Sequence, residues 1–92
     1  MEIFSGIEDH DRYIAWINAH SRDGFVLHSN SPPDGALKLH LARCRFIGAN
    51  GAPPPRGDVW TNYPKRCSTD RAELAQFADA HGGFDECQFC CR

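Results

Sequence analysis

The sequence contains no long hydrophobic run, and its apolar stretches are far shorter than the roughly 20 residues that a bilayer-spanning helix needs. Its first residues lack both the basic start and the apolar segment of a secretory signal. It also shows no internal repeat and no low-complexity segment. These absences predict a cytoplasmic protein that has no membrane partner.

The cysteine content points to a metal rather than to disulfides. The chain has 92 residues, which is near the size at which an apolar core alone gives marginal stability. Its five cysteines are an odd number, and a cytoplasmic location favours reduced thiols. We therefore expect a single domain, residues 1–92, supported by a bound metal ion.

Two short motifs supply donors for such an ion. His40-Leu-Ala-Arg-Cys44 and Cys87-Gln-Phe-Cys90 each place two metal-binding side chains a few residues apart. Together they provide the four donors of a closed tetrahedral zinc site. The sequence thus predicts zinc as the cofactor, with four ligands: His40, Cys44, Cys87 and Cys90.

The other cysteines and a redox role are the alternatives. A redox Cys-x-x-Cys normally lies between a strand and a helix, whereas no helix is expected after Cys90. Cys67 is either a core cysteine or a substitute ligand. Cys91 is the second substitute, although the side chains of neighbouring residues do not easily reach one metal.

Local patterns predict two helices. Ser5 and Glu8 have the spacing of a capping box, so a first helix is expected to begin there. A second helix should begin at Asp70, with Ser68 and Thr69 as rival caps, and should end at Gly82-Gly83. Both have the apolar spacing of an amphipathic helix, through Tyr13, Trp16, Ile17 and His20 in the first and Leu74, Phe77, Ala78 and His81 in the second.

Three strands are expected between the helices. Residues 24–28 and 36–40 flank the turn signal Ser31-Pro-Pro-Asp-Gly35, which predicts a β-hairpin. If Leu37 and Leu39 face one side of it, His40 faces the other. A short third strand is predicted at 59–63, and 48–58 should be an exposed loop. The expected fold class is a small zinc-stabilised α+β domain.

The net charge of −2 is unevenly distributed. Residues 38–71 carry seven bases and two acids, whereas the segments on both sides are acidic. This central basic segment is a candidate nucleic-acid-binding surface, in which cations meet phosphates and aromatic rings stack on bases. A solvated face is the alternative. The candidate residues are Lys38, Arg43, Arg45, Trp60, Tyr63, Lys65 and Arg66.

The order of these features resembles the small zinc-binding module of the Ada DNA-repair family. The resemblance rests on the hairpin, on Leu39-His40-x-x-x-Cys44, on the helix opening Ser68-Thr-Asp-Arg-Ala-Glu73, and on Cys87-x-x-Cys90. It divides the chain into an N-terminal helix, residues 1–23, and an Ada-like zinc module, residues 24–91.

The resemblance implies a zinc-centred α+β fold of the kind that accompanies DNA-acting domains. In Ada proteins a zinc-bound cysteine removes a methyl group from a DNA phosphotriester. His40 occupies the matching position here, and a neutral imidazole does not act as a thiolate nucleophile. This chain therefore departs from the family at the residue that carries the reaction.

Three functions follow from these observations. The first is a zinc-stabilised module that binds DNA or RNA or serves as an adaptor. The second is a protein-interaction module without nucleic acid. An enzyme, using a zinc thiolate or a metal-bound water, is the least favoured, because a closed four-ligand site leaves no open coordination position.

Overall fold

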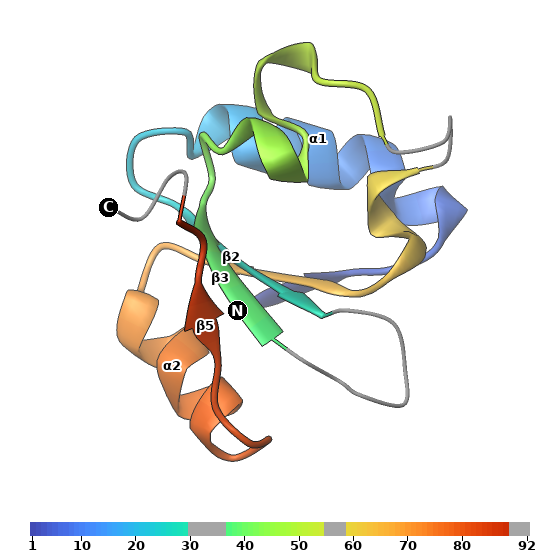
Figure 1. Ribbon diagram of the computed structural model, residues 1–92. Helices are drawn as coiled ribbons and strands as arrows, with labels where there is room; N and C mark the ends of the chain where they lie inside the picture. Colours follow the sequence, from blue (N-terminus) through green and yellow to red (C-terminus); the bar gives the residue numbers. More distant parts are fainter. Residues whose placement is uncertain (30–36, 55–58, 89–92) are drawn as a thin grey trace.

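In the described part of the chain, a five-stranded sheet carries one helix on each face (Figure 1). The computed structural model describes residues 1–29, 37–54 and 59–88. The strand order is β1-β4-β2-β3-β5, and neighbours are antiparallel except β3 and β5, which are parallel. The strands and α-helices are β1 (Glu2–Phe4), α1 (His10–Ala19), β2 (Phe25–Ser29), β3 (Leu37–Leu41), β4 (Lys65–Ser68), α2 (Arg71–Asp79) and β5 (Asp85–Glu86).

The α+β class and the hairpin are confirmed. β2 and β3 pair antiparallel, with Val26 opposite His40 and Leu27 opposite Leu39. Because side chains alternate along a strand, Leu27 and Leu39 face α2, and Val26 and His40 face α1. The predicted turn at 31–35 lies outside the described residues.

The two faces of the sheet bury separate hydrophobic clusters. Full burial of one large apolar side chain is worth about 1.5–3 kcal/mol, so both helices are held mainly by these contacts. Residues of the first 23 positions share the α1-side cluster with the rest of the chain. That cluster contains Phe4, Tyr13, Ile17, Val26, Ala42, Cys44, Ile47, Cys67 and Cys87, and the α2-side cluster contains Leu27, Leu37, Leu39, Leu74 and Ala78.

The third predicted strand is displaced. We expected it at 59–63, but Trp60–Asn62 forms a 3₁₀ turn (η5), and β4 begins at Lys65. Pro64 explains the offset, because proline has no N–H for a strand ladder and is tolerated at strand ends. Beyond it, β4 pairs with β1 on one side and β2 on the other. The edge strands β1 and β5 were not predicted.

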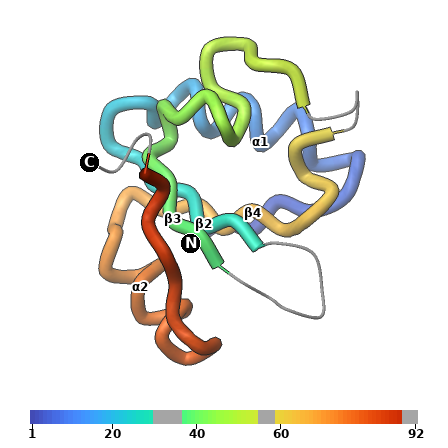
Figure 2. The backbone as a smooth tube through the Cα atoms, in the orientation of Figure 1, coloured from blue at the N-terminus to red at the C-terminus, as the bar shows by residue number. Residues whose placement is uncertain are grey.

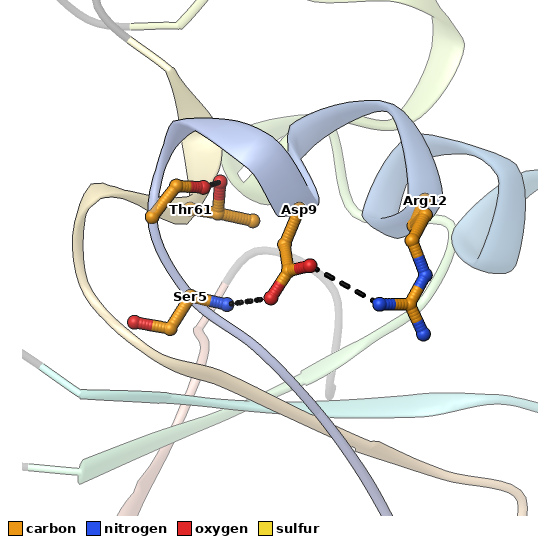
Figure 3. Close-up of polar contacts among 5 residues, drawn as sticks. Ser5, Asp9, Arg12 and Thr61 are labelled. Carbon is orange, nitrogen blue, oxygen red and sulfur yellow. Dashed lines mark hydrogen bonds and ion pairs between the residues drawn. The ribbon is translucent and has the colours of Figure 1, made fainter.

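One of the two predicted helix starts is confirmed and the other is wrong. Asp70 caps α2 as predicted, since its Oδ1 accepts a hydrogen bond at 3.0 Å from the backbone N–H two residues later. The capping box predicted at Ser5 is wrong. The Ser5 N–H donates to Asp9 Oδ2 at 2.9 Å (Figure 3), and α1 begins at His10 after a 3₁₀ turn, η1 (Ile7–Asp9).

Neither α1 nor α2 combines the length and the apolar character that a membrane-spanning helix requires, and the described residues contain no other candidate for a span.

Candidate metal centre

Three of the predicted ligands meet in the interior of the protein. His40, Cys44 and Cys87 each offer one donor atom, and these atoms lie within 4.8 Å of one another. The distance between the two sulfurs, Cys44 Sγ and Cys87 Sγ, is 3.9 Å. The three residues are only 4%, 3% and 3% exposed. The fold therefore brings together donors from two motifs that are more than 40 residues apart in the sequence.

The sheet positions the imidazole. His40 is the fourth residue of β3, and strand alternation directs it to the same face as its cross-strand neighbour Val26. Val26 and Cys44 both belong to the hydrophobic cluster under α1. The ring of His40 thus points away from the leucine-lined face of the hairpin, as the alternation predicts.

A turn after β3 brings Cys44 back toward His40. The Cys44 N–H donates to the Leu41 carbonyl at 3.0 Å, and the Cys44 carbonyl accepts the N–H groups of Ile47 and Ala49, both at 3.2 Å. A single helical turn over 40–45 would also bring an i, i+4 pair of this kind together. Instead His40 is still in the strand and Cys44 has extended backbone angles, φ −74° and ψ 124°.

The parallel edge strand delivers the third donor. β5 runs alongside β3 with Glu86 level with Leu39, and the Cys87 N–H donates to the Leu39 carbonyl at 2.8 Å. In a parallel pair the next residue of one strand lies opposite the next residue of the other. Cys87, which follows Glu86, is therefore level with His40. In Figure 2 the red end of β5 accordingly lies beside the green end of β3. This two-residue strand is what carries Cys87 into the site.

The electrostatics of His40 suit metal binding. Burial, and then the charges of Lys38 and Lys65, lower the pKa of its imidazole to about 4. The ring is therefore neutral at pH 7, which is the form that coordinates a metal. Its Nδ1 is buried and has no hydrogen-bond partner among the described residues. A buried nitrogen left without a partner costs about 1–3 kcal/mol, and coordination would remove that cost.

The donor set and its spacing fit zinc. Imidazole and thiolate are the usual ligands of structural zinc, with Zn–S bonds of about 2.3 Å. In a regular tetrahedron of that size two sulfurs lie about 3.8 Å apart. The observed 3.9 Å between Cys44 and Cys87 matches this edge and far exceeds a disulfide bond of about 2.05 Å.

Of the remaining three cysteines, Cys67 is the one that the described residues include. Cys90 and Cys91 lie beyond the described residues. Cys67 is fully buried in the core under α1, but it is not part of the donor group found in the described part of the chain. Burial, and then the charge of Glu2, raise the pKa of its thiol to about 12. Cys67 is thus a protonated core residue, the first of its two predicted roles.

The candidate nucleic-acid residues are not gathered on one surface. Lys65 is 2% exposed and donates to the carbonyls of Trp60 and Tyr63 at 2.6 and 3.4 Å, and burial lowers its pKa to about 8. The guanidinium of Arg66 lies 4.4 Å from the ring centre of Phe77, on the α2 side. Lys65 and Arg66 therefore point to opposite faces, and Lys65 is not placed to meet a phosphate.

The other members of the set differ in exposure. Trp60 is half-buried, and its indole N–H donates to the Ala52 carbonyl at 3.1 Å, so the ring supports the loop that contains Ala52. Tyr63 is 41% exposed. Lys38, Arg43 and Arg45 are also exposed. The two arginines flank the buried Cys44.

One feature near the candidate metal centre was not anticipated from the sequence. Residues 48–58 were expected to be a plain exposed loop. Residues 45–52 instead form two short 3₁₀ turns, η2 (Arg45–Ile47) and η3 (Ala49–Gly51), beside a hollow. The signal was the run Gly48-Ala-Asn-Gly51, since glycine and asparagine are the residues that tolerate positive φ.

Comparisons of the chain with protein-family models, with curated proteins and with solved structures found no match. The resemblance to the Ada module accordingly rests on ligand spacing and element order. The site itself is argued from its donors: one neutral imidazole and two cysteines, which are buried and close enough together that they could hold a single ion.

Proposed function

We propose that this chain is a zinc-stabilised domain in which His40, Cys44, Cys87 and Cys90 hold one structural zinc ion. The observation that carries the proposal is the buried group of the first three donors, with its sulfurs at the spacing of a tetrahedral edge. Thiolate and imidazole donors favour zinc over magnesium or calcium, which take oxygen ligands. Cys90 is included on its spacing from Cys87.

The metal's role is structural. Four protein ligands close the coordination sphere, so no position is left for a substrate or an activated water. The ion would join β3, the turn after it and the end of β5, which are far apart in sequence. β5 is only two residues long, and its pairing alone is too short to hold the end of the chain. We propose that the metal attaches β5 to the rest of the domain.

The domain's own activity is binding. We propose a nucleic-acid-binding or adaptor role in a reducing, cytoplasmic setting, where the thiolate ligands stay intact. Support comes from Arg43 and Arg45, exposed on both sides of Cys44, and from an Ada-like order of hairpin, helix and closing cysteine pair. Methyl transfer is not part of the proposal, because His40 stands where the nucleophile would be.

A protein partner is the second candidate. Ile3, Ile7 and Phe46 are large apolar side chains with exposures of 52%, 74% and 54%. Exposed apolar side chains mark a site of protein contact where they form one continuous patch. A pull-down would not separate the candidates, whereas a salt titration would, since nucleic-acid binding weakens steeply as salt rises.

Native mass spectrometry of protein purified without added metal tests the zinc. We expect one zinc ion per chain in the wild type and in Cys67→Ala, and none in Cys44→Ala. A folded, metal-free wild type with dispersed NMR signals would refute the proposal.

Cobalt substitution tests the fourth ligand. The intensity of the thiolate-to-cobalt charge-transfer bands scales with the number of thiolates bound. Cys90→Ser should lose one thiolate's share of this intensity, and Cys91→Ser should lose none. The reverse pattern would reassign the ligand to Cys91, and two unchanged spectra would leave the site with two thiolates.

A further inference from the structure

A hollow lies next to the metal centre, on the loop that follows Cys44. Its volume is about 290 Å³, and Arg45, Ala49, Asn50 and Ala52 line it. Ala49 is buried and Ala52 is half-buried, while Arg45 and Asn50 are exposed. The hollow thus combines an apolar floor with one cationic and one amide side chain.

The indole of Trp60 holds both ends of this loop. A Cβ atom at Gly48 would lie 2.9 Å from Trp60 Nε1, so the ring packs directly against the bare backbone there. The same nitrogen donates to the Ala52 carbonyl at 3.1 Å. Gly48 has φ 111°, a conformation that side chains other than glycine rarely adopt. The loop is therefore built around the tryptophan.

Further hydrogen bonds hold the loop against the core. The buried Tyr13 hydroxyl donates to the Ile47 carbonyl, and the Cys44 carbonyl accepts two N–H groups from the loop. Asn50 has φ 60° and ψ 30°, the left-handed region in which asparagine is tolerated. The hollow is thus preformed, and a ligand would not have to order it.

The cationic side chain on the hollow has no ion-pair partner within the described ranges 1–29, 37–54 and 59–88. Arg12 and Arg71 form ion pairs with Asp9 and Glu86, but Arg45 forms no ion pair with any described residue. An exposed guanidinium presents a planar fork of donors that matches two phosphate oxygens. The amide of Asn50, on the same hollow, adds a neutral donor.

We propose that this hollow binds the phosphate group of a nucleotide, either free or within a single strand. Arg45 pairs with the phosphate, Asn50 donates to it or to the sugar, and the alanine methyls of the floor contact the sugar. Trp60 is a positioning residue, which acts by holding Gly48 and Ala52. The inference deepens the nucleic-acid-binding role proposed above and gives it a location.

NMR titration of the zinc-loaded protein tests the site, with adenosine monophosphate, a short oligouridine and inorganic phosphate as separate probes. We expect the amide signals of 45, 49, 50 and 52 to shift with both nucleotide probes. Arg45→Gln should weaken binding about tenfold or more, because a charge-assisted pair is lost. Arg22→Gln, at another exposed arginine distant in sequence, is the matched control and should change nothing.

Salt dependence separates the two roles at the hollow. For the oligouridine, Arg45→Gln should reduce the slope of log affinity against log salt by about 0.7, the value for one phosphate contact on a single strand. Trp60→Phe should weaken binding without changing this slope, since it alters the loop and removes no charge.

Several results would overturn the inference. They are an equal effect of Arg45→Gln and Arg22→Gln, shifts confined to other parts of the protein, or no binding by any probe. Inorganic phosphate that binds as tightly as the nucleotide would show an anion site only and refute the nucleotide. The zinc content of each sample is measured alongside, so failure of the hollow in zinc-loaded protein leaves the metal proposal intact.

Discussion

Replacing Cys44 by alanine should cost far more stability than the same change at Cys67. Both side chains are buried in the same hydrophobic cluster, with exposures of 3% and 0%, and both changes remove one sulfur atom. Only Cys44 belongs to the donor group. The pair therefore separates the loss of a metal ligand from the loss of packing.

The expected sizes differ by several-fold. Leaving a cavity of about one methyl group costs roughly 1 kcal/mol, and this term applies to both variants. Zinc binding at a closed site contributes on the order of 10 kcal/mol to folding, which is comparable to the whole stability of a typical domain. We expect Cys67→Ala to lose about 1 kcal/mol, and Cys44→Ala to lose most of its stability.

Urea unfolding followed by circular dichroism measures these losses, in a zinc buffer and in excess chelator. In chelator the wild type should fall to within about 1 kcal/mol of Cys44→Ala, because the metal contribution is then absent from both. Should Cys44→Ala not fold at all, the wild type with and without chelator still gives the metal term. Equal losses for the two variants in zinc buffer, together with no effect of chelator on the wild type, would refute the metal centre.

Three further changes probe the structure around the site. Lys65→Met should remove a pH dependence of stability, because burial lowers the pKa of Lys65 from 10.5 to about 8 and its charged form therefore destabilises the folded state. Urea unfolding should show the stability of the wild type, relative to the variant, rising by up to about 3 kcal/mol between pH 8 and 10.5. Tyr13→Phe should cost about 1–3 kcal/mol, because the buried carbonyl of Ile47 loses its donor, and thermal unfolding reports the loss. Gly48→Ala should cost at least about 1 kcal/mol, since the new Cβ meets Trp60 at 2.9 Å and φ is 111°, and a change in Trp60 fluorescence should accompany it.

Local patterns predicted the parts of this fold that local physics determines. The cap at Asp70 and the hairpin depend on neighbouring residues and on alternation, and both are present. β1 and β5 have three and two residues, too few for any periodicity, and they exist only because distant partners offer free edges. The failure of the predicted capping box has the same origin, since a distant partner holds this segment: the Gly6 N–H donates to the Thr61 carbonyl, and the Gly6 carbonyl accepts the Thr61 hydroxyl.

The candidate metal ligands were more predictable than the charged surface, for a physical reason. A ligand motif names residues whose chemistry requires them to converge, so the grouping of His40, Cys44 and Cys87 follows once β5 lies beside β3. A count of charges carries no such requirement. Lys65 adds to the basic total of the sequence, yet its ammonium is buried and donates to the carbonyl of Trp60. Both its burial and its hydrogen-bond partner depend on where the chain turns.

The turn at residues 60–62 links the loop after Cys44, residues 45–52, to the rest of the domain. The Trp60 indole supports Gly48 and Ala52, and the carbonyl of the same residue accepts the buried Lys65 ammonium. Its backbone N–H donates to His10 Nδ1 at 3.2 Å, which ties the turn to the first residue of α1. A side chain that the sequence suggested as a surface for bases thus holds the loop after Cys44 against α1 and β4. A ligand of that loop would be coupled to the core through Trp60 as well as through the hydrogen bond from Tyr13 to Ile47.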